Sequence, residues 1–77
     1  MTDNGTKHNS LGGRLRVARL EAGFTIRQLA DALGVDPRTV NRWQSNDADP
    51  SIERMGLIAR VLDKSPAYFL DEREVAA

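Results

Sequence analysis

The chain has 77 residues, no cysteine, and equal numbers of basic and acidic side chains, eleven of each. So short a chain forms one small domain, which excludes a deep catalytic cleft between two lobes, and without cysteine it has neither disulfides nor a thiolate metal site. Its apolar stretches are far shorter than a membrane span, and its polar first ten residues are unlike a secretory signal, so we expect a cytoplasmic protein.

The basic side chains are concentrated in the first part of the chain. Residues 1–44 hold seven basic and four acidic side chains, whereas residues 45–77 hold four basic and seven acidic ones. This asymmetry favours an anionic partner for the first part. Ordinary solvated charges would give the same pattern, so charge alone leaves both interpretations open.

The first predicted helix follows a stretch, residues 1–10, that lacks apolar periodicity and is expected to be a flexible arm. Apolar side chains at helical spacing then begin, with Ser10 as the expected N-cap and Gly23 as the end of the helix. The expected inward residues of this helix are Leu11, Leu15, Ala18 and Ala22.

The second and third predicted helices are short and closely spaced. Thr25 is the expected N-cap of the second helix, and Gly34 ends it. Its expected apolar residues are Ile26, Leu29, Ala30 and Leu33. Asp36 and Pro37 begin the third helix, about residues 37–44, as N-cap and first helical residue. Val40 and Trp43 are expected to face inward from it.

The remaining elements follow a loop over residues 45–50, which consist of turn-forming residue types. Ser51 is the expected N-cap of a fourth helix with Ile52, Met55, Ile58, Ala59 and Leu62 inward. Ser65 and Pro66 begin a short fifth helix that carries Tyr68, Phe69 and Leu70. No segment alternates long enough to be a strand. The sequence therefore predicts an all-α domain of five short helices over residues 11–70, followed by a polar tail over residues 71–77.

The joint between the second and third helices carries the functional signal. Four residues, 33–36, are too few for the helices to run side by side, so a steep crossing is expected. Ala30 is small enough for the crossing point, and Gly34 can supply the positive φ that the joint needs. The third helix then turns an outward set away from the core: Pro37, Arg38, Asn41 and Arg42.

The strings LRVARLEAGFTIRQLADALGVDPRTVNRW and DPSIERMGLIARVLDKSPAYFL are similar to the phage repressor/Cro family. The resemblance covers about residues 11–70 and includes five helices in matching order. It implies a lambda-repressor-like fold in which helices two and three form a helix-turn-helix motif and the third helix reads operator DNA. It also implies that Gln44, where the family often has Glu, pairs with Arg19.

The candidate site residues fall into two groups. Base contacts are expected from Arg38, Asn41, Arg42 and Pro37, because arginine can bond a guanine edge and asparagine an adenine edge. Backbone contacts are expected from Thr25, Arg27, Gln28, Thr39, Ser45 and Asn46. At the helix starts, backbone donors point towards phosphates. The alternatives are solvated surface residues in the first group and helix capping alone at the helix starts.

The sequence thus predicts a sequence-specific transcriptional regulator that binds double-stranded DNA at a palindromic operator as a weak homodimer. The expected dimer contact lies near Tyr68, Phe69 and Leu70. The alternative is a protein-interaction adaptor, which the acidic Asp47 and Asp49 favour and the exposed arginines oppose. No catalytic set of side chains, glycine-rich phosphate loop or metal cluster is present in the sequence, so we expect no enzyme, cofactor, metal, small-molecule substrate or membrane.

Overall fold

The computed structural model describes residues 10–69, and this part of the chain is all-helical, as predicted. It contains α2 (Leu11–Glu21), α3 (Ile26–Leu33), α4 (Pro37–Gln44), α5 (Ile52–Val61) and a 3-10 turn, η1 (Pro66–Phe69). The predicted arm up to residue 9, Leu70 and the predicted tail over residues 71–77 lie outside the described residues.

The predicted fifth helix is wrong as an α-helix: residues 10–69 hold four α-helices, and the fifth element is the four-residue turn η1. The Tyr68 backbone N–H donates to the Ser65 carbonyl at 2.9 Å, so the expected start at Ser65 is correct. A single turn gains too few hydrogen bonds to hold itself, because helix nucleation is costly. Tertiary packing holds it instead, since Phe69 is buried against the core, η1 packs on α2 and α5, and the Arg14 Nη1 donates to the Tyr68 carbonyl at 3.0 Å.

The N-caps predicted for the four α-helices occupy their expected places. The side chains of Ser10, Thr25, Asp36 and Ser51 each accept a hydrogen bond from a backbone N–H in the first turn of the following helix. Such a cap contributes about 1 kcal/mol by satisfying a donor that has no partner within the helix. Local side-chain chemistry therefore determines where each α-helix begins.

The core gathers apolar side chains from every element. Its buried members are Leu15, Ala18, Leu29, Ala30, Leu33, Val40, Trp43, Ile58, Ala59, Leu62 and Phe69. Two predicted inward residues are corrected. Ala22 is exposed because it is the C-cap, beyond the last turn of α2. Ile52 is 91% exposed, because the buried residues of α5, Ile58 and Ala59, lie in its second half.

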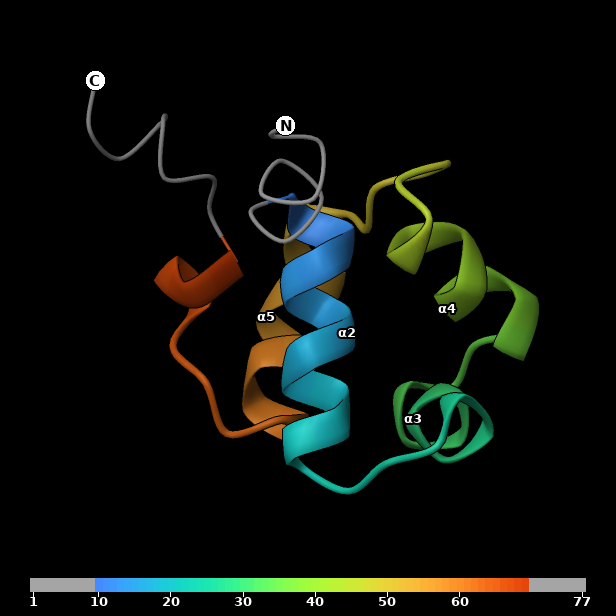
Figure 1. The fold of residues 1–77 in the computed structure, drawn as a ribbon, viewed down its shortest axis with the longest axis horizontal. Helices are drawn as coiled ribbons and strands as arrows, with labels where there is room; N and C mark the ends of the chain where they lie inside the picture. The colour runs from blue at the N-terminus through green and yellow to red at the C-terminus, as the bar shows by residue number, and fades with distance from the viewer. Residues whose placement is uncertain (1–9, 70–77) are drawn as a thin grey trace, which may run out of the picture.

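Helix α3 is steeply inclined to α2 (Figure 1), since α2 is seen lengthwise while α3 is seen end-on. Helix α4 packs against both α3 and α2, α5 packs against α3 and η1, and η1 packs against α2. This arrangement holds α4 from two sides. Within the part of the chain that the structure describes, no helix has the length and apolar character needed to cross a membrane.

Candidate nucleic-acid interface

The joint between α3 and α4 has the predicted form. Gly34 ends α3 with φ 72°, in the left-handed region that glycine enters without steric cost. The Val35 N–H then donates to the Ala30 carbonyl at 3.0 Å, and Ala30 is completely buried. The small side chain at the crossing and the glycine in the turn together allow the close approach of the two helices.

Arg54 reinforces this joint from α5. Its Nη1 donates to the Leu33 carbonyl at 2.9 Å, at the C-terminal end of α3. The carbonyls at that end carry partial negative charge and lack helical donors, so a guanidinium stabilises them. Arg54 was not among the predicted site residues. The available signal was a cation near the N-terminus of its own helix, where the helix dipole disfavours it and an external partner is favoured.

The inner side of α4 is built into the core, as predicted, with Val40 completely buried and Trp43 5% exposed. At its C-terminal end, the Gln44 Oε1 accepts from the Arg19 Nε at 2.7 Å. The same guanidinium donates from Nη1 to the Phe24 carbonyl at 2.8 Å. Burial of Arg19, and to a smaller extent the nearby charge of Arg16, lower the pKa of the Arg19 guanidinium. The pair implied by the family resemblance is therefore present.

A second contact between α2 and the end of α4 runs through Asn46. Its Oδ1 accepts from the Gly12 N–H at 2.9 Å, and its Nδ2 donates to the Ser10 Oγ at 3.1 Å. Asn46 has φ 63°, a conformation that asparagine tolerates better than most residues. Asn46 was predicted as a DNA backbone contact; the structure uses its side chain to hold the start of α2.

Gly12 is where these two elements touch. A Cβ at this position would lie 2.6 Å from the Trp43 carbonyl oxygen, 2.8 Å from the Asn46 Oδ1 and closer still to the Gln44 carbonyl oxygen. Only glycine permits that approach without a shift of backbone. This packing role was not predicted, because it depends on residues more than thirty positions away in the chain.

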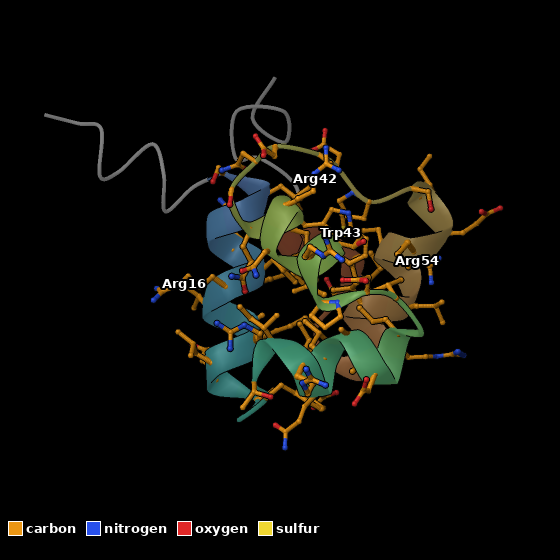
Figure 2. The ribbon with its side chains drawn as sticks, turned by 90° about the vertical axis from the view of Figure 1, so that its right-hand side faces the viewer. Arg16, Arg42, Trp43 and Arg54 are labelled. Atoms are coloured by element: carbon orange, nitrogen blue, oxygen red, sulfur yellow. The ribbon has the colours of Figure 1, made fainter. Side chains whose placement is uncertain are left out.

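The outward set of α4 lies on the side facing solvent. Asn41 and Arg42 are exposed, and neither side chain has a hydrogen-bond or ionic partner among residues 10–69. The Arg38 side chain is 89% exposed, with its Nε 3.6 Å from the Asp36 Oδ1, whereas Pro37 is half-buried. Figure 2 looks at the molecule from the side of α3 and α4, with Arg42 and Trp43 labelled on α4. The predicted base-contact residues therefore share one helix and lie beside one another.

The predicted backbone contacts are more scattered. Thr25 and Gln28 form a reciprocal capping box at the start of α3, which leaves the threonine hydroxyl hydrogen and the glutamine amide hydrogens available. Arg27 is exposed on the same turn. Thr39 is half-buried in the first turn of α4. The Ser45 hydroxyl donates to the Asn41 carbonyl at 2.8 Å, so it can donate to a phosphate only if the hydroxyl rotates away from that carbonyl.

The charges around this surface are mixed. Four exposed carboxylates come from α3, from the N-cap of α4 and from the loop that follows α4: Asp31, Asp36, Asp47 and Asp49. No group of three or more potential metal-ligating side chains occurs among the residues that the structure describes. Because these carboxylates lie among the arginines, an interface with nucleic acid would depend on particular side chains more than on a large positive surface.

Comparisons with known proteins agree with this arrangement. The helix-turn-helix family model matches residues 15–69. The HTH-type transcriptional regulator DicA of Escherichia coli is 32% identical over 65 residues, covering 84% of this chain and 48% of DicA. The HTH-type transcriptional regulator ImmR of Bacillus subtilis is 28% identical over 67 residues, covering 87% of this chain and 53% of ImmR. The chain thus spans about half the length of these curated relatives.

A solved structure supports the same assignment. The N-terminal DNA binding domain of SinR from Bacillus subtilis superposes with a TM-score of 0.74 at 31% identity, covering 86% of this chain and 97% of that one. The matched region includes all of α3, α4 and the joint between them, whose geometry is that of the motif. The chain belongs to the helix-turn-helix family of the phage repressor/Cro type.

Proposed function

We propose that this protein is a transcriptional regulator that binds double-stranded DNA in a sequence-specific manner, with α4 in the major groove. The observation that carries the proposal is the contrast within α4, whose inner side is buried while Asn41 and Arg42 face solvent without partners. In a helix held this firmly the backbone is already ordered, so only the side chains themselves lose conformational entropy when they meet base edges. Two relatives named as transcriptional regulators and a DNA-binding domain of similar fold support it.

The base-reading residues of the proposal are Arg38, Asn41, Arg42 and Pro37. Arginine can donate two hydrogen bonds to the O6 and N7 of guanine, and asparagine can bond the N6 and N7 of adenine. Each such pair discriminates against a wrong base by about 1–3 kcal/mol. The contact of Arg38 with Asp36 is an exposed ion pair at 3.6 Å, so exchanging it for a base costs little.

The backbone contacts of the proposal are Thr25, Arg27, Gln28, Thr39, Ser45 and Asn46. The first three lie at the start of α3, where free backbone donors and the helix dipole favour a phosphate. For Asn46 we propose a smaller part, because its side chain already bonds Gly12 and Ser10 and retains one amide hydrogen for a phosphate.

We further propose that the DNA site is a palindromic operator that two copies occupy as a weak homodimer. One recognition helix reads only a few base pairs, so useful affinity in a genome requires two, with half-sites about 34 Å apart. Such a regulator acts in the cytoplasm of a bacterial cell, where the DNA lies. The exposed Asp47 and Asp49 are the observation in favour of the adaptor alternative, but Asn41 and Arg42 provide no apolar anchor for a protein partner on α4, so DNA binding is the better-supported function.

The test is selection of binding sites from a random duplex library with the purified protein. The proposal predicts enrichment of one consensus composed of two inverted half-sites. The Asn41→Ala, Arg42→Ala double variant, which keeps the core intact, should lose that enrichment. Recovery of unselected sequences by the wild-type protein at all salt concentrations would overturn the proposal.

A further inference from the structure

The outward side of α5 carries a surface that the proposed DNA contact does not use. Four exposed residues form it, and we call them the α5 outer face: Glu53, Gly56, Leu57 and Arg60. They lie opposite Ile58 and Ala59, which are buried in the core. Leu57 is 43% exposed, and a Cβ at Gly56 would have no heavy atom within 4 Å. The face therefore combines a partly exposed apolar side chain with an open, flat position beside it.

The charges of this face are symmetric about its centre. Glu53 and Arg60 are seven residues apart, two helical turns or about 10.5 Å along the axis, too far to pair with each other. Neither forms an ion pair with another residue in the 10–69 range, unlike Glu21, whose Oε1 lies 2.9 Å from the Lys64 Nζ. One acidic and one basic group thus flank Gly56 and Leu57 at equal distances along the helix.

We propose that the α5 outer face is the self-association surface of this protein, on which α5 of a second copy lies antiparallel. A two-fold axis between Gly56 and Leu57 sets Glu53 of each copy opposite Arg60 of the other. The same axis brings Leu57 against Leu57 of the second copy, while Gly56 permits close approach of the helices. This inference rests on the proposed function, because it locates the weak homodimer proposed there.

A second copy fits this face better than an unrelated protein does, because two-fold contacts use one patch that is complementary to itself. Opposite charges at equal distances from a common centre have that property. Next to the face, an apolar groove of about 490 Å³ is lined by Pro50, Ile52, Met55, Gly56, Pro66 and Ala67. The 91% exposed Ile52 lies at its edge and adds apolar area. Four residues on one side of one helix offer less area than a stable interface buries, so this contact is expected to be weak.

The structure also argues against the contact expected from the sequence near residues 68–70. Phe69 is 2% exposed and belongs to the core. Tyr68 is half-buried, with the Lys64 Nζ 4.8 Å from its ring centroid. Leu70 lies outside the described residues. Within the described part of that segment no large apolar side chain is free for a partner, so the α5 outer face takes its place.

The test exchanges charges and measures self-association without DNA by sedimentation equilibrium, at protein concentrations up to about 1 mM because the contact is small. The Glu53→Arg variant places arginine at both charged positions, and the Arg60→Glu variant places glutamate at both. Each variant alone should associate about tenfold more weakly than wild type, because two attractive contacts become repulsive. An equimolar mixture of the two should form a heterodimer at least as tight as the wild-type homodimer.

Matched controls are Asp31→Arg and Arg16→Glu, which make the same charge changes at exposed positions on α3 and α2. Each control variant alone, and an equimolar mixture of the two, should associate as strongly as the wild-type protein. Circular dichroism of each variant checks that the fold is retained. Failure of the charge-exchanged pair to associate on mixing would overturn the α5 contact. Selection of a DNA consensus by the wild-type protein tests the proposed function separately. If the consensus is selected but the charge-exchanged pair does not associate, the α5 contact is wrong and the proposed function stands.

Discussion

The C-terminal end of α4 and its outer face differ sharply in how their polar groups are used. At the end, Gln44 bonds Arg19, and Asn46 bonds Gly12 and Ser10, so α2 fixes the helix in place. On the outer face, Asn41 and Arg42 have no side-chain partners among residues 10–69. The C-terminal end of α4 is thus fixed to α2, whereas these polar side chains on the outer face beside it are not used by any other described residue. Polar groups that are satisfied hold the helix, and those that are free are available to a ligand.

The largest expected effect comes from removing the close approach at Gly12. Gly12→Ala places a methyl group against two carbonyl oxygens of the α4 end, and backbone must move to admit it. We expect a net loss of about 2 kcal/mol in the free energy of unfolding, since overpacking outweighs the better helix propensity of alanine. Urea unfolding measures it.

The matched control for that change is Gly56→Ala, which adds the same methyl group to open space on a helix. It should raise the free energy of unfolding by about 0.5–1 kcal/mol through helix propensity alone. Equal stability of Gly12→Ala and wild type would mean that the two helices are not in the close contact described.

A smaller effect is expected at Asn46. Asn46→Gly keeps a residue that accepts φ 63° while deleting the side-chain bonds to Gly12 and Ser10. We expect a loss of about 1 kcal/mol in the free energy of unfolding, the net value of the part-buried bond to Gly12, because the bond to Ser10 is exposed to water and adds little. Affinity for the selected DNA site, measured with folded protein, should fall only slightly. A large loss of affinity with unchanged stability would show that Asn46 serves DNA instead of α2.

The smallest effect is a gain at Gln44. Gln44→Glu converts the 2.7 Å bond with Arg19 into a charge-assisted one, worth about 0.5–1 kcal/mol at pH 7. The guanidinium holds the new carboxyl pKa below its unfolded value of about 4.3. The gain is therefore fully present above that value and is lost as the pH falls through the folded pKa. Urea unfolding of both proteins at neutral and acidic pH checks the sign, and a pH-independent difference would refute the ion pair.

Much of the fold was predictable because its signals are local. The caps at Ser10, Thr25, Asp36 and Ser51 act within three residues of themselves, so each helix start could be located from sequence. The positive φ at Gly34 is likewise a property of one residue. The outward direction of Asn41 and Arg42 follows from the inward direction of Val40 and Trp43 on the same helix.

The rest depends on residues far apart in the chain. Asn46 meets Gly12 across 34 positions, and Arg54 meets the Leu33 carbonyl across 21. The spacing of apolar residues along the sequence does not indicate such pairs, because each residue taken alone looks like an ordinary turn or surface residue. Ile52 illustrates the same limit: it shares the helical stripe of the buried Ala59, yet it is 91% exposed because the neighbouring elements do not cover that end of α5.

The most direct test of the central claim, that the outer face of α4 reads DNA sequence, is the effect of Arg42→Ala on the selected consensus and all its single-base variants. We expect affinity for the consensus to fall by about 1–3 kcal/mol and discrimination to be lost at one base pair of each half-site. Arg27→Ala, on the proposed backbone contact, should weaken every sequence alike. Uniform weakening by Arg42→Ala, or no weakening at all, would contradict the account.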